Sequence, residues 1–390
     1  MTAIPQMNIN FTFSPPSLEE ISRRVELVQE RMRHQRLDWY LCFSPDNVYY
    51  LTHFANFVHE RPFILLIRSS GKPKFVAPKL EIPHILSRKV GDVELIEYFE
   101  FPAAAGHGWS DRLNALMGDG GSVGLESVCP LKIYEAIRGR RVVTDIVDDL
   151  RLIKSPYEIG RMAYAGKIAS AAMHDLLAKA TVGRSLAEVM AAGKSLMLGL
   201  LIRDDPSINP LATRADAVFQ PPKYSDDPHN FTNLAMSMEK GGPHVSVVNA
   251  VLNGYGSEVE RTFFLGQVPE KAKKPFDAMM QARELAFTMV KPGVRMSDVD
   301  RAVNDLLEAR GYGENLLHRT GHGMGVTGHE APFLAEGDTR IIEPGMCFTI
   351  EPGIYLRGIG GFRHSDTILV TDSGNMRLTE APQSLEELTL

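Results

Sequence analysis

The chain has 390 residues and a formal net charge of -6, with 44% hydrophobic and 23% charged residues. This length is too great for one ordinary domain, so we expect two domains, each with a substantial core. The chain has no uncharged apolar run long enough to cross a bilayer and no Lys/Arg-rich block, so we expect neither a membrane nor a nucleic-acid partner, and a small molecule or peptide as substrate.

The first 150 residues alternate between patterns typical of helices and of strands. A capping box formed by Ser17 and Glu20 predicts the start of a helix. Strand-like runs follow, the second and third joined as a hairpin, at residues 39–43, 63–67, 75–77, 93–98 and 123–126. This alternation predicts an α/β domain over residues 1–150.

A second domain, residues 151–390, is predicted to begin at Ser155-Pro156-Tyr157-Glu158, which combines an N-cap serine, a proline at the first helical position and a glutamate at the third. A long helix follows, and further helices are predicted at 275–290 and 297–310. Strands are predicted at residues 245–252, 259–265, 346–350 and 367–371. The pattern favours helices packed over a curved antiparallel sheet, so the whole chain is expected to be α/β (α+β).

The cysteines and the N-terminus bear on the cellular compartment. Cys42, Cys129 and Cys347 are far apart in the sequence, which is typical of neither a disulfide framework nor a zinc knuckle. Residues 1–15 have neither the basic nor the apolar region of a secretory signal. We therefore expect a cytoplasmic protein.

Three motifs follow one another near the C-terminus: Thr320-Gly321-His322-Gly323, Ile350-Glu351-Pro352-Gly353 and Gly361-Phe362-Arg363-His364-Ser365-Asp366. In this order they resemble the active-site signature of the pita-bread family, which includes methionine aminopeptidase, aminopeptidase P, prolidase and creatinase. The resemblance implies a hydrolase with a creatinase/prolidase-type N-terminal domain and a catalytic pita-bread domain.

The metal-binding positions of this family are incomplete in the chain. Metal-dependent members hold two ions with two Asp, one His and two Glu, and the resemblance places His322 and Glu351 at two of these positions. Glu258 stands at one Asp position, but Val247 and Ser365 stand where carboxylates are needed. Neither side chain can replace a carboxylate for hard divalent cations, so we expect no metal cofactor. The alternative is one weakly bound divalent ion, such as Mn or Fe, held by Glu258, His322 and Glu351.

The site pattern resembles most closely that of creatinase, a metal-free member. Its strand also ends in Glu-Arg-Thr, which matches Glu260-Arg261-Thr262, and its catalytic His, followed by Asn, matches His229. The resemblance implies that His229 is the general acid and base and that Glu260 and Glu351 are catalytic groups holding the substrate. Substrate contacts are expected from His322, His329, Glu258 and His364.

Creatinase also contributes Phe-x-Arg to the site of the neighbouring subunit, where this chain has His59-Glu60-Arg61. The resemblance therefore predicts a homodimer in which Arg61 and His59 reach the partner's site. Creatinase has a guanidinium-binding Glu at the position of His364 and a carboxylate-binding Arg at that of Ala335, so creatine is not the expected substrate. The segment 201–224 departs from the pattern and is expected to shape specificity.

These features favour metal-independent hydrolysis of a C-N bond in a small substrate with a guanidino, amidine, amine or amide group. Closely spaced carboxylates without a counter-ion repel one another, so a cationic or hydrogen-bond-donating nitrogen group would stabilise them. Two alternatives remain open. One is a metal-dependent Xaa-Pro dipeptidase or aminopeptidase P-like peptidase with an atypical metal site. The other is a non-catalytic pita-bread protein that binds partners.

Overall fold

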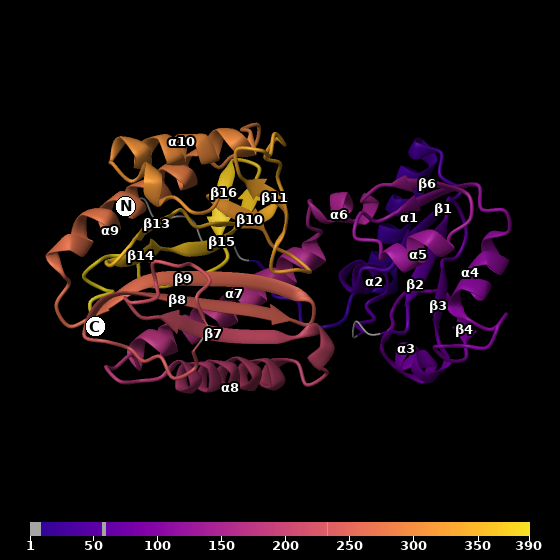
Figure 1. Cartoon of the computed structure of the whole chain (residues 1–390), viewed down its shortest axis with the longest axis horizontal. Helices are drawn as coiled ribbons and strands as arrows, with labels where there is room; N and C mark the ends of the chain where they lie inside the picture. Colours follow the sequence, from indigo (N-terminus) through magenta and orange to yellow (C-terminus); the bar gives the residue numbers. More distant parts are fainter. Residues whose placement is uncertain (1–8, 57–59, 232) are drawn as a thin grey trace. The chain divides into compact units, whose positions relative to one another are not determined.

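The computed structural model describes residues 9–56, 60–231 and 233–390, which form two compact units. Residues 14–151 form the N-terminal unit, and residues 9–13 together with 152–390 form the C-terminal unit. The expected two-domain α/β fold is confirmed (Figure 1). No helix in these ranges combines the length and the apolar character needed to cross a membrane.

The N-terminal unit is a six-stranded sheet with helices around it. Its strands are β1 (Trp39–Cys42), β2 (Ile64–Arg68), β3 (Lys74–Pro78), β4 (Glu94–Tyr98), β5 (Ser122–Leu125) and β6 (Arg140–Val143). Its helices are α1 (Leu18–Gln35), α2 (Pro45–Thr52), η1 (Lys79–Glu81), α3 (Ile82–Arg88), α4 (Trp109–Met117), α5 (Leu131–Ala136) and α6 (Ile146–Arg151). The strand order is β4-β3-β2-β1-β5-β6, and the predicted hairpin is the antiparallel pair β2–β3.

The C-terminal unit is built on a long, mainly antiparallel sheet. Its strands are β7 (Arg214–Gln220), β8 (Gly241–Leu252), β9 (Tyr255–Leu265), β10 (Gly321–Gly323), β11 (Glu330–Leu334), β12 (Cys347–Ile350), β13 (Gly353–Leu356), β14 (Gly360–Arg363), β15 (Ser365–Thr371) and β16 (Gly374–Arg377). The order is β11-β10-β12-β15-β9-β8-β7, with β16 paired to β15, while β13 and β14 form a separate hairpin. This arrangement brings β9, β12 and β15 together, and each carries or adjoins a predicted site residue.

In the described part of this unit there are four long helices and two short ones: α7 (Pro156–Ala178), α8 (Leu186–Asp204), α9 (Glu270–Met289), α10 (Met296–Ala309), η2 (Pro210–Ala212) and η3 (Gly313–Asn315). The helices α7 and α8 pack on β7, β8 and β9, while α9 and α10 pack together beside the hairpin and β11 (Figure 1). Ser155 begins α7 as predicted, because its hydroxyl accepts the N–H of Glu158 while the Glu158 carboxylate accepts that of Ser155. In contrast, α9 begins at Glu270, before the expected start at Pro275.

The predicted boundary at residue 150 placed the N-terminal segment in the first domain, but residues 9–13 belong to the C-terminal unit. Arg161 of α7 donates to the carbonyl oxygens of Phe13 at 2.6 Å and Thr12 at 3.2 Å. The Phe13 ring also packs edge-on against Tyr164, with 4.7 Å between ring centroids. Because these contacts join positions about 150 residues apart, no local pattern indicates them.

Candidate functional site

Three buried carboxyl groups meet at the centre of the C-terminal unit. Glu258 and Glu260 are two positions apart on β9 and therefore point to the same face of the sheet. Glu351 directly follows β12, which pairs with β15 next to β9. One oxygen of each carboxyl group lies within 4.8 Å of the other two. The exposed fractions of Glu258, Glu260 and Glu351 are 5%, 3% and 7%, so water screens the charges of these carboxyl groups only weakly.

Burial raises the pKa of Glu258 to about 8, and repulsion by Glu351 adds to the shift. Burial likewise raises the pKa values of Glu260 and Glu351. The Arg363 guanidinium opposes all three shifts but is one positive charge among three carboxyl groups. The cluster therefore has the electrostatic character of a cation-binding site.

Arg363 connects the carboxyl cluster to a tyrosine and a histidine. Its guanidinium donates to Glu260 at 2.9 Å and to the Tyr355 hydroxyl at 3.0 Å. The Tyr355 hydroxyl lies 2.7 Å from Nε2 of His318, whose Nδ1 lies 2.8 Å from the Arg319 carbonyl oxygen. Since that carbonyl can only accept, Nδ1 of His318 carries the proton and Nε2 accepts from Tyr355. Burial lowers the pKa of His318 to about 3, which keeps this ring neutral.

His322 and His329 lie next to the carboxyl cluster. Their ring centroids are 4.0 Å apart, and ligand atoms of both rings and of Glu258 lie within 4.8 Å of one another. Nδ1 of His322 is 3.1 Å from the Gly323 carbonyl oxygen, so its Nε2 lone pair faces a Glu351 oxygen at 3.2 Å. Burial lowers the pKa of His322 to about 3, so this contact is not the ion pair of an imidazolium. Two acceptors that face each other require a proton or a cation between them.

Val247 and Ser365 lie in the site, as the sequence comparison placed them. Val247 is directly opposite Glu260 in the β8–β9 pair, and the Ser365 hydroxyl donates to a Glu258 oxygen at 3.2 Å. Neither supplies a carboxylate, so the residues present do not fit two bridged divalent ions. They do fit one ion, with ligands from Glu258, His322 and His329, and a Glu351 oxygen lies beside His322.

The prediction that His364 binds substrate is wrong. Its side chain is completely buried and packs edge-on against Phe276 of α9, with 5.4 Å between ring centroids. Arg363 and Ser365 on either side of it contact the carboxyl cluster. Because side chains alternate along an extended chain, His364 must point away from the site.

The other predicted residues lie in different places. His229 is exposed in the loop between β7 and β8, close enough for its charge to disfavour protonation of His318 and His329. Arg61 pairs with Glu100 of its own unit, with 2.7 Å between nitrogen and oxygen, and His59 lies outside the described residues. In the segment 201–224, Phe219 is buried in the core.

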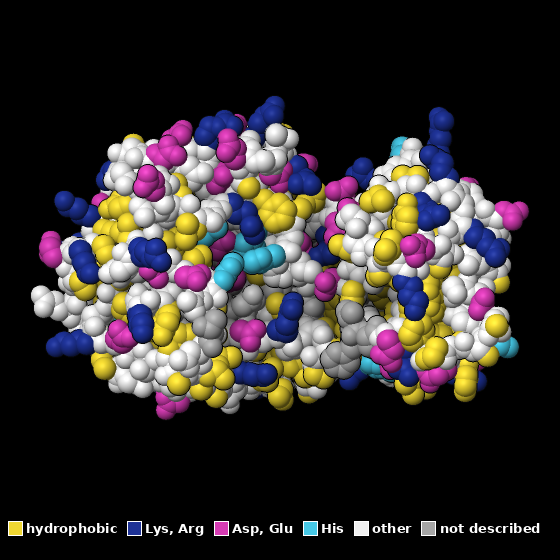
Figure 2. Space-filling view, in the orientation of Figure 1, with side chains coloured by type: hydrophobic (Ala, Val, Ile, Leu, Met, Phe, Trp, Pro, Cys, Tyr) yellow, Lys and Arg dark blue, Asp and Glu magenta, His cyan; other side chains and the backbone are white. Residues whose placement is uncertain are grey.

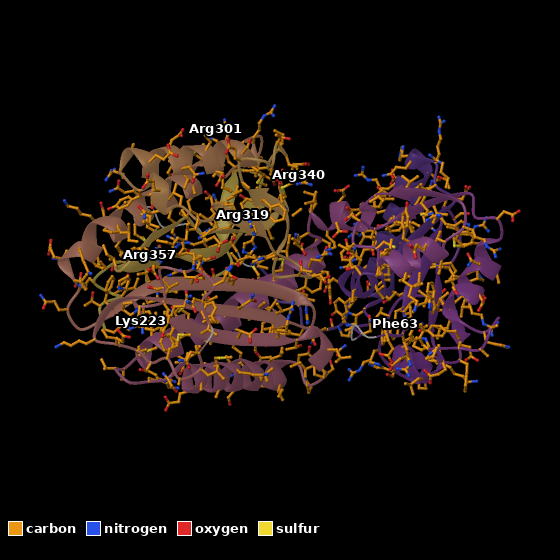
Figure 3. The ribbon with its side chains drawn as sticks, viewed as in Figure 1. Phe63, Lys223, Arg301, Arg319, Arg340 and Arg357 are labelled. Carbon is orange, nitrogen blue, oxygen red and sulfur yellow. The ribbon has the colours of Figure 1, made fainter. Side chains whose placement is uncertain are left out.

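Sequence reasoning missed His318, Arg319 and Tyr355. His318 and Arg319 directly precede the Thr-Gly-His-Gly motif, and Tyr355 lies in β13, two residues after the Glu-Pro-Gly motif. Their closeness in sequence to two site motifs was the signal that could have identified them as site residues. Histidine side chains reach the surface on one face of this unit, beside a basic side chain at the place where Arg319 is labelled (Figures 2 and 3).

Comparison with known proteins gives consistent matches. The family model described as "Metallopeptidase family M24" matches residues 160–372, and "Creatinase/Prolidase N-terminal domain" matches residues 24–153. The chain is 30% identical to YkvY of Bacillus subtilis, covering 88% of this chain and 93% of that protein. It is 25% identical to the Xaa-Pro dipeptidase of Pyrococcus furiosus, covering 94% and 100%. The structure of the Xaa-Pro dipeptidase from Bacillus anthracis matches with a TM-score of 0.79 and 26% identity, covering 94% and 99%.

These matches correct two expectations. The sequence favoured a metal-independent C-N hydrolase without a cofactor, but the matching family is one of metallopeptidases and the named relatives include Xaa-Pro dipeptidases. The structure also brings ligand atoms of Glu258, His322 and His329 within 4.8 Å of one another. Both expectations are therefore wrong, because the loss of two carboxylates removes the two-ion arrangement without removing the capacity to bind one ion.

Proposed function

Because the chain is a hydrolase that belongs to metallopeptidase family M24, we propose that it cleaves Xaa-Pro dipeptides with one divalent metal ion in an atypical site. One observation carries the proposal: Glu258, His322 and His329 bring three ligand atoms within 4.8 Å, next to the carboxylate of Glu351. The relatives named as Xaa-Pro dipeptidases support the substrate class.

Glu258, His322 and Glu351 would hold the ion, with His329 as the further ligand on the exposed side. When bound, a divalent ion supplies a Lewis acid and lowers the pKa of a coordinated water. The low pKa of His322 suits this role, because only a neutral imidazole can be a ligand.

The remaining groups would orient the substrate and move protons. We propose that His229, exposed in its loop, gives a proton to the leaving nitrogen of proline. Glu260 is held by Arg363, which is held in turn by Tyr355, so the Glu260 carboxylate has a fixed orientation towards the bound peptide. Tyr355 and His318 would thus act as positioning residues behind Arg363.

The test is to measure bound metal and hydrolysis of Xaa-Pro dipeptides together. We expect one ion per chain, loss of hydrolysis after chelation, and recovery with Mn²⁺ or Co²⁺. Glu258→Gln and His322→Ala should lose both the ion and activity, while Glu314→Gln, on the exposed surface of the same unit, should keep both. Full activity without metal would contradict the proposed mechanism. Metal binding without hydrolysis of any Xaa-Pro peptide would contradict the substrate class and favour a binding protein.

We also propose that the protein is a homodimer in which Arg61 and His59 reach the partner's site, and that it is cytoplasmic. Arg61 has a quarter of its side chain exposed and pairs with two carboxylates, Glu60 and Glu100. Free cysteines at three scattered positions support a reducing compartment. Light scattering tests the dimer, and mixing Arg61→Ala subunits with subunits inactivated at His322 tests whether a site is shared.

A further inference from the structure

Arg319 lies between η3 and β10, three residues before His322. Its side chain is half-buried, and its guanidinium carbon stacks over the Phe333 ring of β11 at 5.0 Å from the ring centroid. Stacking on an aromatic ring restricts the orientation of the guanidinium plane. Arg319 is therefore held in place by an apolar contact that leaves its hydrogen-bond donors free for another group.

Within the described parts of the chain, the Arg319 guanidinium forms neither an ion pair nor a hydrogen bond, although its Nε is buried. The fully buried arginines of this unit are paired, Arg261 and Arg283 with Asp366 and Arg363 with Glu260, whereas half-buried Arg319 is not. A partly desolvated guanidinium without a counter-ion is unfavourable. This difference indicates that the partner of Arg319 is a bound anion.

Arg319 and Phe333 line a cavity of about 640 Å³ together with Ala335, Gly337, Asp338, Thr339 and Arg340. The second arginine, Arg340, donates to Asp338 at 2.8 Å and is neutralised. Figure 3 labels both arginines on the face that Figure 2 shows with exposed histidines. The small side chain of Ala335 and the absence of one at Gly337 leave space beside the guanidinium. The cavity thus combines room for a ligand with one unneutralised positive charge.

The cavity adjoins the proposed metal site. The positive charge of Arg319 disfavours protonation of His322 and His329 and stabilises the ionised form of Glu351. In a dipeptide the terminal carboxylate belongs to the residue directly after the cleaved bond, and consecutive Cα atoms are about 3.8 Å apart. A peptide bond placed at Glu351 and His322 therefore has its carboxylate within reach of a neighbouring arginine.

We propose that Arg319 binds the C-terminal carboxylate of the substrate and thereby makes the enzyme select dipeptides over longer peptides. The fork of the guanidinium matches a carboxylate with two parallel hydrogen bonds. This inference rests on the proposed function and names the substrate group that its site would recognise.

The experiment compares Ala-Pro with its C-terminal amide and with Ala-Pro-Ala. For the wild-type protein we expect kcat/KM to be about 100-fold higher for Ala-Pro than for its amide. The amide lacks the carboxylate and therefore loses a charge-assisted bidentate contact. Arg319→Met keeps the stem over Phe333 and should remove this preference by lowering only the value for the free acid. Arg319→Lys keeps the charge and should restore part of the preference. Arg301→Met, on the exposed surface of the same unit and paired with Asp298, is the matched control and should retain the preference.

Calorimetric binding of the same peptides separates this inference from the proposed function. If the wild-type protein cleaves the acid and the amide equally well, or if Arg319→Met lowers both equally, Arg319 is not the anchor, while the peptidase function stands. If no peptide is cleaved but Ala-Pro still binds in an Arg319-dependent way, the anchor stands and the proposed function fails. If no peptide binds or is cleaved, both fail.

Discussion

The Ser365 hydroxyl donates a hydrogen bond of 3.2 Å to Glu258, and Ser365 is the direct cross-strand neighbour of Glu260. A short polar side chain thus occupies the place next to both β9 glutamates where a carboxylate would complete a two-ion site. Val247, opposite Glu260 on the other neighbouring strand, occupies the second such place. Val247 and Ser365 therefore lie on either side of β9, and both lack the negative charge that a two-ion site would need at this location.

The double substitution Val247→Asp with Ser365→Glu should restore a two-ion site. We expect bound Mn²⁺ to rise from one to two per chain, because both missing carboxylates return beside Glu258 and Glu260. Without metal the variant should unfold at a lower temperature, since five carboxyl groups then share one buried site. Metal analysis and thermal unfolding with and without Mn²⁺ measure these effects. The variant Val247→Asn with Ser365→Gln has similar shape without the charge, and a second ion in it would contradict the explanation.

Tyr355→Phe should weaken both stability and activity. The substitution removes the hydroxyl that connects His318 with Arg363 and leaves a buried imidazole nitrogen without its donor. We expect a loss of about 1–3 kcal/mol in the free energy of unfolding, measured by urea denaturation. We also expect kcat to fall with little change in KM, because Arg363 and Glu260 lose their orientation. Tyr312→Phe changes a half-buried tyrosine of the same unit and is the control. An equal effect of this substitution would argue against a specific role for Tyr355.

Asp366→Asn should be strongly destabilising. The Asp366 carboxylate is completely buried between the guanidinium groups of Arg261 and Arg283, and it also accepts from the Thr379 hydroxyl at 2.8 Å. Neutralising it leaves two buried positive charges uncompensated, which typically costs about 3–5 kcal/mol. Denaturant unfolding measures the loss. Asp298→Asn, which breaks an exposed ion pair with Arg301, should change stability by less than about 1 kcal/mol.

His244 should make the protein less stable in mild acid. Its ring is buried, stacks on Phe263 with 4.9 Å between centroids, and accepts the Glu239 N–H at 3.0 Å through Nε2. Burial lowers the pKa of His244 to about 4 from an ordinary value of 6.5, so the unfolded chain binds the proton more tightly. The contribution is therefore complete above pH 6.5 and is lost as the pH falls towards 4, by roughly 3 kcal/mol.

The free energy of unfolding, measured between pH 4 and pH 7, tests the role of His244. Subtracting the values for His244→Phe from those of the wild-type protein removes the contribution of all other titrating groups. The difference should decrease steadily below pH 6.5. His174→Gln, on the exposed surface of α7, should show no such trend, and a flat difference for His244→Phe would contradict the assignment.

Much of the architecture was predictable because its signals are local. Ser17 and Ser155 begin α1 and α7 as their capping patterns indicate, since both partners of each box lie within three residues. The five strand-like runs of the N-terminal unit correspond to β1 to β5, and in all of these except β4 successive residues are buried. The resemblance also predicted His322, Glu258 and Glu351 as site residues, and in the structure these three residues lie next to one another.

The sequence alone determined the family, the two-domain fold and the absence of two carboxylates, because these are properties of residue identity and short-range pattern. Only the tertiary structure decided that His364 faces the core, since the chain passes from the β13–β14 hairpin into the main sheet at that residue. It also decided that His318 meets Tyr355, 37 positions away, and that the Nε of Arg319 has no hydrogen-bond partner among the described residues. Such relationships depend on which distant strands become neighbours, and local periodicity carries no information about that choice.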